Sequence, residues 1–358
     1  MNKVLFIISD FEGGGTQRVI SLIANNLIRD NYEIKICLIN QSKIKYFLSK
    51  KVKTIELNIR SNKKNFFDFI FKNLQRLVLL RKTFKSHKDY ILVSFLNTTN
   101  ILCLLSSIGL NSKVIINERN DILKQKLNFS WRFLKFMTYN LADLIITNNK
   151  SNLLFLKSKY GKKVNYINNP VEIKKFKKQK RKKIILSVGS LNDQKNYLQL
   201  LRCFKAFSLK NDNWTYNILG EGQLRKKLIE YIKFLDLEKK VKIFNFTDPS
   251  SFYKKSSIFI HGAKYEGTPN VLLEAMSFRI PIISSDYNGS SDIIKNNYNG
   301  IIYQIESDED LLKKMQHLAF SNNLRKELSD NGYSYVKKYD ISEISKEWIK
   351  LLNKLKKS

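Results

Sequence analysis

The sequence repeats one local pattern many times: a short apolar run, a turn rich in glycine or small polar residues, and a segment with apolar side chains at helical spacing. In the first copy, residues 3–9 lead into three consecutive glycines at 13–15, and a helix is predicted after them. Runs that are apolar throughout are typical of strands buried on both faces of a parallel sheet. Strand, glycine turn, helix and strand in this order open a doubly wound α/β domain.

The same alternation continues along the chain and predicts two similar domains. In the first half, further strands are predicted at residues 33–39, 90–95, 113–117, 144–147 and 164–167. In the second half, strands are predicted at 183–189, 215–219, 241–246, 257–261 and 281–285, with helices at 197–209, 224–235 and 270–278. A chain of 358 residues exceeds the usual size of one hydrophobic core, which also favours two domains.

The boundary between these domains is predicted from charge. Residues 171–183 are mostly charged and read as a basic linker between an N-terminal domain, 1–170, and a C-terminal domain, 184–340. A final helix at 341–358 has Ile344, Trp348 and Leu352 at helical spacing. That apolar face needs a surface to cover, either on its own domain or on the first one.

The net charge of +33 comes from 64 Lys and Arg against 31 Asp and Glu, and it favours polyanionic partners. Nucleic acid, anionic lipid headgroups and phosphorylated substrates all fit, and part of the excess reflects general enrichment in lysine. The apolar start of the chain lacks the cleavage site of a secretory signal, and no stretch is long enough to span a bilayer. We therefore expect a cytoplasmic protein. Cys37, Cys103 and Cys203 are expected as buried core residues, with no metal site.

Several turns are placed where α/β sheets bind ligands, at the carboxyl ends of strands. Gly14 and Gly15 precede a helix start, and Glu221 lies between two glycines after another predicted strand. Such turns can cradle an anion, but tight turns without any ligand are about as common. Lys195 stands beside a helix start after the strand at 183–189, where an ammonium can meet a phosphate.

The segment with the strongest functional signal is residues 265–276, YEGTPNVLLEAM. Pro269 suits a first helical turn, and helix-start amides near Asn270 can receive a diphosphate. Glu266 in the preceding loop and Glu274 on the helix can accept hydrogen bonds from sugar or ribose hydroxyls. Glu274 lies in an apolar stretch, so we expect it to be partly buried and to need a partner.

These motifs resemble the retaining glycosyltransferases of family 4. The resemblance covers nearly the whole chain through GGGTQRV, NNPVE, SVGSLNDQKN, LGEGQLRKKL, YEGTPNVLLEAM, SDYNGSSDII and NGIIY. It is similar above all to the members that build bacterial polysaccharide repeat units, where NERND at 117–121 also has a counterpart. The resemblance implies the GT-B architecture, an α/β fold of two doubly wound Rossmann-like domains facing a central cleft. It also implies an acceptor-side first domain and a nucleotide-sugar-binding second domain.

The resemblance also implies roles for individual residues. Glu266 would lie near the transferred sugar, Lys195 would bind phosphate, and these two form the expected catalytic pair. Glu274 would hold the ribose hydroxyls. The remaining expected donor-binding residues are Gly267, Thr268, Pro269, Asn270, Val271, Gly14, Gly15, Ser190, Glu221 and Phe246.

The sequence departs from the family pattern at three places. Ser190 stands where many relatives have an arginine, and Phe278-Arg279 replaces a small residue and glycine. We therefore expect the phosphate side of the site, with Ser190 and Arg279, to differ most. Residues 94–100 lack the histidine that many relatives carry near the active site. His261 is a candidate substitute, although a packing role is the expectation for it.

The family mechanism implies little side-chain acid–base chemistry, because the leaving diphosphate can take the acceptor proton while the enzyme stabilises its charge. A metal-dependent route needs an Asp-x-Asp after a strand. The match at Asp308-Glu309-Asp310 instead opens a predicted helix, where acidic residues stabilise the N-terminus. We expect metal-independent transfer and no cofactor.

Two stretches of the first domain, residues 60–88 and 127–141, combine large apolar residues with many basic ones. Basic amphipathic helices suit anionic membrane surfaces, although the apolar faces are expected to belong to the core for much of their length. The expected protein is peripheral on the inner face of the cell membrane. It would move a hexose or N-acetylhexosamine from a nucleotide-sugar, with UDP favoured, to a polyprenyl-diphosphate-linked saccharide in O-antigen or capsule synthesis.

Two other classes remain open from the sequence. A nucleotide-sugar epimerase of the same architecture would explain the glycine turns. A basic nucleic-acid-binding protein would explain the charge, but the basic residues are spread over all segments and no binding module is recognised, so nucleic acid is not an expected partner.

Overall fold

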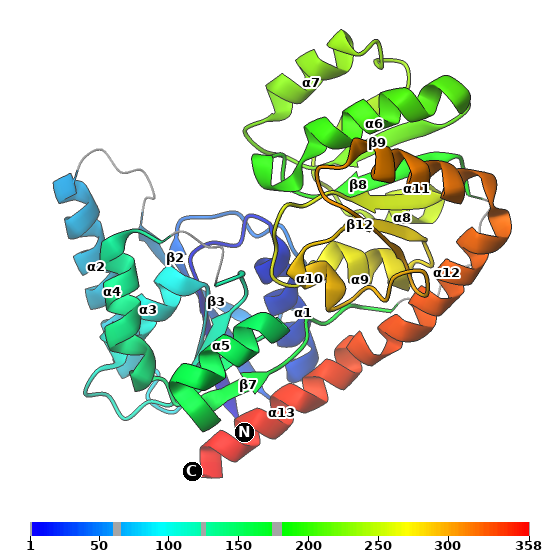
Figure 1. Ribbon diagram of the computed structural model, residues 1–358. Coiled ribbons are helices and arrows are strands. Elements are labelled where there is room, and N and C mark those ends of the chain that lie inside the picture. The colour runs from blue at the N-terminus through cyan, green and yellow to red at the C-terminus, as the bar shows by residue number, and fades with distance from the viewer. Residues whose placement is uncertain (1, 60–65, 123–126, 174–180, 358) are drawn as a thin grey trace. The chain divides into compact units, whose positions relative to one another are not determined.

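A computed structural model describes residues 2–59, 66–122, 127–173 and 181–357 (Figure 1). The chain divides into unit 1, Met1–Pro170 with Ile341–Ser358, and unit 2, Val171–Asp340. Residues 174–180 of the expected linker lie outside the described residues. No helix among the described residues combines the length and the apolar character needed to cross a membrane.

Unit 1 contains a fully parallel sheet of seven strands in the order β3-β2-β1-β4-β5-β6-β7. The strands are β1 (Lys3–Ile8), β2 (Glu33–Asn40), β3 (Lys53–Ile59), β4 (Ile91–Phe95), β5 (Val114–Glu118), β6 (Leu144–Thr147) and β7 (Val164–Tyr166). The helices are α1 (Gly15–Arg29), α2 (Phe66–Ser86), α3 (Asn97–Ser107), α4 (Phe129–Thr138), α5 (Lys150–Tyr160) and α13 (Ile341–Lys357).

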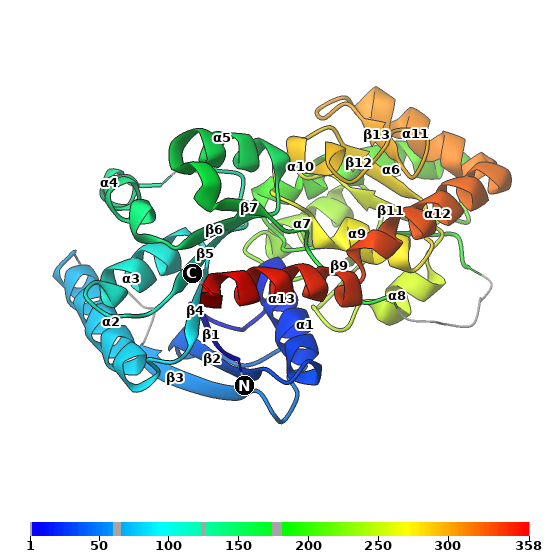
Figure 2. The ribbon, with the colours of Figure 1, turned by 90° about the horizontal axis from the view of Figure 1, so that it is seen from below.

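The continuous apolar run of β1 is explained by a core on each face of this sheet. Val4 and Phe6 pack into a cluster with α1 and α13, whereas Leu5 and Ile7 point into a second cluster with α2 and α3. Alternate strand residues face opposite sides, so a strand covered on both faces needs apolar residues throughout. Figure 2 shows α13 alongside α1, and Trp348 of α13 is fully buried in the same cluster as Val4.

Unit 2 contains a second parallel sheet, of six strands, in the order β10-β9-β8-β11-β12-β13. The strands are β8 (Ile184–Val188), β9 (Thr215–Leu219), β10 (Val241–Phe244), β11 (Ile258–His261), β12 (Ile282–Ser285) and β13 (Ile301–Tyr303). The helices are α6 (Tyr197–Lys210), α7 (Arg225–Phe234), α8 (Ser250–Lys255), α9 (Asn270–Ser277), α10 (Asn288–Ser291), α11 (Asp308–Phe320) and α12 (Asn322–Val336).

The two strand orders share one feature that positions a site. In each unit the first strand is central and the chain builds the sheet outward on both sides of it, so the order reverses between β1 and β4 and between β8 and β11. Ligands of doubly wound sheets bind at the carboxyl ends of the strands at this reversal. The predicted fold class, two doubly wound Rossmann-like domains, is confirmed.

Arg181 shows that the end of the basic segment 171–183 is part of unit 2. Its guanidinium donates hydrogen bonds to the carbonyls of Tyr253, Ser256, Phe278 and Arg279, at the carboxyl ends of α8 and α9. Burial lowers the pKa of Arg181 to about 10. A cation is favourable at helix carboxyl ends. Arg181 therefore connects the ends of α8 and α9, whereas the sequence predicted that this segment is a solvated linker. Cys37, Cys103 and Cys203 are free and buried, as predicted.

Candidate functional site

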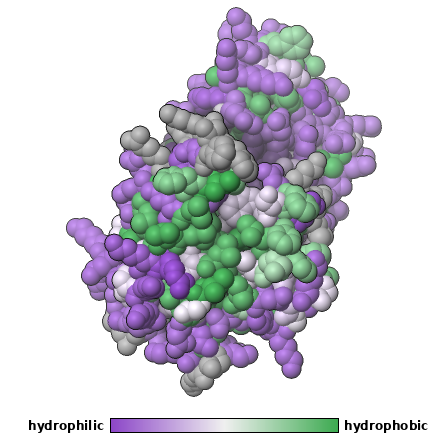
Figure 3. Space-filling view, turned by 90° about the vertical axis from the view of Figure 1, so that its left-hand side faces the viewer, coloured by the Kyte–Doolittle hydropathy of each residue, from purple (hydrophilic) through white to green (hydrophobic). Residues whose placement is uncertain are grey.

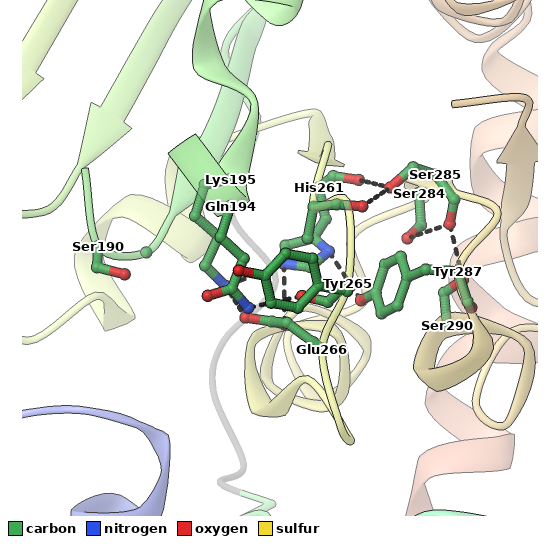
Figure 4. Close-up of polar contacts among 12 residues, drawn as sticks. Ser190, Gln194, Lys195, His261, Tyr265, Glu266, Ser284, Ser285, Tyr287 and Ser290 are labelled. Carbon is green, nitrogen blue, oxygen red and sulfur yellow. Dashed lines mark hydrogen bonds and ion pairs between the residues drawn. The ribbon is translucent and has the colours of Figure 1, made fainter. Parts of the chain in front are cut away.

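An ion pair lies at the carboxyl edge of the unit 2 sheet, beside the reversal of strand order. Lys195 ends the short helix η3 (Asp193–Lys195) that follows β8, and Glu266 lies in the loop after β11. The Lys195 ammonium contacts Oε1 of Glu266, and both side chains are largely buried (Figure 4). The sequence singled out both residues independently, and the fold brings them together.

Electrostatics keep Glu266 ionised in this position. Burial by itself raises the pKa of Glu266, but attraction by Lys195 and hydrogen bonding from His261 outweigh it and hold the pKa at about 2. The carboxylate therefore only accepts hydrogen bonds at any physiological pH. It is 17% exposed, so an incoming ligand can reach it.

The loops that carry this pair are joined to each other by hydrogen bonds. Gln194 donates from Nε2 to the carbonyl of Tyr265 at 2.6 Å, and the Lys264 amide donates to the carbonyl of Gln194 at 2.8 Å. Gly289 of α10 packs so closely that a Cβ there would stand 1.6 Å from the carbonyl oxygen of Gly267. Only glycine allows this approach, so the Glu266–Gly267 backbone is confined between two neighbouring segments.

Glu274 is half-buried on α9 and accepts a hydrogen bond from the hydroxyl of Tyr253 at 3.1 Å. Tyr253 comes from α8 and is fully buried. Pro269 caps α9, and the helix starts at Asn270 with Val271 next to it. The amides at this helix start are a suitable place for an anionic group. Gly267 is buried and Thr268 half-buried in the same loop.

The other expected donor-binding residues lie in different surroundings. Ser190 is exposed and stands apart from the Lys195–Glu266 pair in Figure 4. Glu221 is exposed after β9, and Phe246 is half-buried after β10. Gly14 and Gly15 belong to unit 1, where they begin α1.

The glycines beside Glu221 have a structural reason. A Cβ at Gly220 would stand 1.9 Å from the carbonyl oxygen of Gly189, and one at Gly222 would stand 2.4 Å from that of Leu191. The turns after β8 and β9 therefore touch backbone to backbone. This contact explains both glycines without a ligand.

The expectation that Arg279 lies on the phosphate side is wrong. Arg279 follows the carboxyl end of α9, whereas the expected anion site is at the amino end. Its guanidinium pairs with Asp330 at 2.6 Å and lies over the ring of Tyr333 at 3.9 Å. Its φ of 55° is left-handed, the conformation that glycine adopts most easily.

The acidic triplet Asp308-Glu309-Asp310 occupies the first turn of α11, as predicted, with Ser307 as the N-cap. Asp308 pairs with Arg202 at 2.9 Å, and Asp310 accepts the Gln304 amide at 2.9 Å. These carboxylates are engaged in structural contacts.

A second polar cluster, in unit 1, was not predicted as a site. Glu118 ends β5, and its Oε1 accepts from Lys135 of α4 at 2.7 Å and from Tyr139. Lys135 also donates to Asn97 at 2.8 Å. Asn100, within the stretch that lacks the expected histidine, is fully buried and donates to the carbonyl of Asn117. The signal in the sequence was NERND, a polar run directly after an apolar strand.

Comparison with known proteins agrees with this picture. Residues 168–335 match the family model described as glycosyl transferases group 1. The chain is 31% identical to a Campylobacter jejuni GalNAc-alpha-(1->4)-GalNAc-alpha-(1->3)-diNAcBac-PP-undecaprenol alpha-1,4-N-acetyl-D-galactosaminyltransferase, over 99% of each chain. A second C. jejuni enzyme, an N-acetylgalactosamine-N,N'-diacetylbacillosaminyl-diphospho-undecaprenol 4-alpha-N-acetylgalactosaminyltransferase, is 26% identical over 98% of this chain and all of its own. Among solved structures, Anabaena HepE in complex with UDP and glucose superposes with a TM-score of 0.85 at 15% identity, covering 99% of this chain and 100% of HepE.

Proposed function

Because this chain belongs to the group 1 family of glycosyl transferases, we propose a specific reaction for it. It transfers a hexose or N-acetylhexosamine from a UDP-sugar to a polyprenyl-diphosphate-linked saccharide, with retention of the anomeric configuration. The product belongs to bacterial surface polysaccharide, such as O-antigen or capsule. Two relatives with undecaprenyl-linked acceptors in their names, and the UDP bound to HepE, support this choice.

The observation that carries the proposal is the buried Lys195–Glu266 pair beside the start of α9. An ammonium and the amides of a helix start together suit a diphosphate. Glu274, oriented by Tyr253, lies about one turn into α9, which starts at Asn270, and accepts the ribose hydroxyls. Glu266 then stands near the transferred sugar.

In this proposal the protein stabilises charge and positions groups. The bond from the anomeric carbon to the diphosphate breaks as the acceptor hydroxyl attacks from the same face, and a departing phosphate oxygen takes the acceptor proton. Lys195 and the α9 amides stabilise the negative charge that develops on the diphosphate. We expect metal-independent transfer, because Asp308 and Asp310 are engaged in other contacts and Lys195 supplies the positive charge.

Retention is supported by stereochemistry. The names of both C. jejuni relatives state alpha linkages. Common UDP-hexoses and UDP-N-acetylhexosamines carry the sugar in the alpha configuration, so an alpha product from them requires retention. The same outcome is proposed for this chain.

The test is a product analysis with a panel of UDP-sugars and a synthetic undecaprenyl-diphosphate saccharide, with and without EDTA. One donor should give a lipid-linked product with an alpha linkage by NMR, at the same rate after chelation. A beta linkage contradicts retention, and complete loss of activity in EDTA contradicts the metal-independent route. Consumption of donor without any acceptor points to an epimerase instead.

The proposed membrane partner rests on an exposed apolar surface formed by α2 and α4, here called the α2/α4 face. These helices were expected to turn their apolar sides inward for much of their length. Part of each helix does pack into the core, through Leu80 and Phe84 of α2 and Trp131 and Leu134 of α4. Several other large apolar side chains are more than half exposed: Phe71, Leu74 and Val78 on α2, and Phe129, Phe133, Phe136 and Met137 on α4. Figure 3 shows apolar surface gathered on this side of the molecule.

Apolar side chains are exposed on the α2/α4 face, whereas Lys135 of α4 points toward the sheet. Lys135 is held by Glu118, and Phe69 of α2 packs edge-on against Trp131 of α4. Exposed patches of this kind mark interaction surfaces, and the net charge of +33 favours anionic lipid. The side chains of Phe66 and Phe67, also singled out in the sequence, lie outside the described residues.

Vesicle flotation tests this partner. Phe136→Ser should lower the fraction bound to phosphatidylglycerol vesicles about tenfold, since a phenylalanine side chain is then no longer buried in lipid. Phe320→Ser is the matched control, because Phe320 is equally exposed but lies on α11 of unit 2. Equal binding of both variants, or binding that does not fall with salt, contradicts membrane docking through the α2/α4 face.

A further inference from the structure

His261, the last residue of β11, contacts polar groups from three segments of the donor site (Figure 4). Its Nδ1 lies 3.0 Å from the hydroxyl of Tyr287, which follows β12. Its Nε2 lies 3.3 Å from Oε2 of Glu266 and 3.4 Å from the ammonium of Lys195. Since His261 and Tyr287 are each only 3% exposed, these contacts are made away from bulk water.

The neighbours of His261 determine where its proton lies. Burial lowers the pKa of His261, with Lys195 adding to that effect and Glu266 opposing it, so the ring is neutral. Two groups face Nε2, the Lys195 ammonium at 3.4 Å and the nearer Oε2 of Glu266 at 3.3 Å. Glu266 is ionised and can only accept, so we assign the proton of the imidazole to Nε2, pointing to Oε2. Nδ1 is then an acceptor, and the Tyr287 hydroxyl donates to it. The bond to one ring nitrogen thus fixes the state of the other.

Glu266 has two partners of different kinds. Lys195 holds Oε1 through a flexible side chain from the turn after β8, and a lysine ammonium can turn toward another anion. His261 holds Oε2 from the end of a buried strand. A donor diphosphate at the start of α9 attracts Lys195, and Glu266 then keeps the bond from His261.

We propose that His261, with its ring fixed by Tyr287, is a positioning residue that holds the Glu266 carboxylate in place when Lys195 turns to the donor diphosphate. This role rests on the proposed function of the site. It replaces the packing role expected from the sequence, and it gives Tyr287 a role as the residue that orients the ring, while Glu266 selects the tautomer.

Tyr287 is itself held firmly. Its amide donates to the carbonyl of Ser285 at 3.1 Å, and its own carbonyl accepts from the hydroxyl of Ser290 at 2.7 Å. Ser285 in turn donates to the carbonyl of Ala263 at 2.6 Å, in the loop that leads to Glu266. The segment after β12 is therefore tied to the Glu266 loop at several points, which keeps the Tyr287–His261–Glu266 alignment.

The first experiment needs no turnover. Histidine ¹⁵N NMR on the full chain resolves which ring nitrogen carries the proton, and with 3 histidines the His261 signal is assigned by its loss in His261→Gln. The proposal predicts a proton on Nε2 in the wild type and, because the Glu266 carboxylate selects this tautomer, a mixture of tautomers in Glu266→Gln. A proton on Nδ1 in the wild type overturns it. This result stands even for a chain that transfers no sugar, so it is distinguishable from a failure of the proposed function.

The second experiment separates positioning from folding. His261→Leu should lower kcat about 10- to 100-fold with little change in the donor KM, because a hydrogen bond to a charged group is lost during transfer. His261→Gln can place an amide N–H near Nε2 and should recover most of that loss. An unchanged kcat in His261→Leu, or a KM effect without a kcat effect, overturns the proposal. Thermal unfolding of each variant shows whether the fold is intact.

Discussion

Both units place a carboxylate–lysine pair at the carboxyl edge of a parallel sheet, but the two pairs are built from different elements. In unit 1, Glu118 ends strand β5 and Lys135 lies within helix α4, and the Glu118 side chain is only 1% exposed. In unit 2, Glu266 comes from a loop and Lys195 from the three-residue helix η3, and Glu266 is 17% exposed. We therefore interpret the unit 1 pair as stabilising the fold, and the unit 2 pair as able to exchange partners with a ligand.

The largest expected effect is a loss of transfer activity when Lys195 of the unit 2 pair is replaced. Lys195→Met should lower kcat/KM for transfer about 100- to 1,000-fold, because the developing charge on the diphosphate loses its ammonium. Steady-state kinetics measure this effect. Lys183→Met is the matched control, since Lys183 is exposed at the opposite end of β8. Equal activity of the two variants breaks the assignment of the phosphate site to Lys195.

The next effect concerns stability in unit 1. Glu118→Gln should destabilise the protein by about 3 kcal/mol, because it leaves the buried charge of Lys135 without its carboxylate. Urea unfolding followed by tryptophan fluorescence measures this change. The folded variant should keep kcat within about threefold of the wild type at low temperature. A large loss of kcat with unchanged stability would show that the Glu118–Lys135 pair acts in catalysis. The two pairs would then not differ in function.

Tyr253 and Tyr139 each donate a hydroxyl hydrogen bond to a glutamate, one in each unit, and form a matched pair for mutation. Tyr253→Phe should weaken UDP binding about fivefold, the usual effect of losing one hydrogen bond, because Glu274 is then less well oriented. Tyr139→Phe removes the hydroxyl that donates to Glu118 and should affect stability while leaving UDP affinity unchanged. Isothermal titration calorimetry with UDP checks both. Weaker UDP binding in Tyr139→Phe, with unchanged binding in Tyr253→Phe, would contradict this prediction.

The smallest expected effect is at Arg279. Arg279→Gly relieves a left-handed backbone and removes a half-exposed ion pair with Asp330, two opposite contributions. The net change in the free energy of unfolding should stay below about 1 kcal/mol. UDP affinity should not change. A clear loss of UDP affinity would indicate that Arg279 does contribute to the phosphate side of the donor site.

The fold was predictable from the sequence wherever strands are buried on both faces. The apolar runs of β1, β8 and β11 predicted both doubly wound sheets. β3 was missed because it is an edge strand with alternating exposed residues, and β13 because it has only three residues. The orientation of α4 could not be predicted, since helical spacing locates an apolar face but does not show whether it packs inward.

The sequence predicted those residues of the candidate site that belong to a recognisable motif after a strand. Residues 265–276 and Lys195 stood out because they follow strand ends, and parallel strands bring such ends together. The contact of His261 with Tyr287 could not be read from the sequence. It depends on β11 and β12 being neighbours in the sheet, and on the close approach of α10 to the Glu266 loop.

In the proposed reaction, Lys195 exchanges Glu266 for the donor diphosphate. Measuring donor binding and turnover in a single variant, Glu266→Gln, tests this exchange most directly. Removing the carboxylate charge frees Lys195, so UDP should bind at least as tightly as to the wild type by calorimetry, while kcat falls about 100-fold or more. Loss of UDP affinity in parallel with kcat would contradict the exchange and leave the pair as a structural element of unit 2.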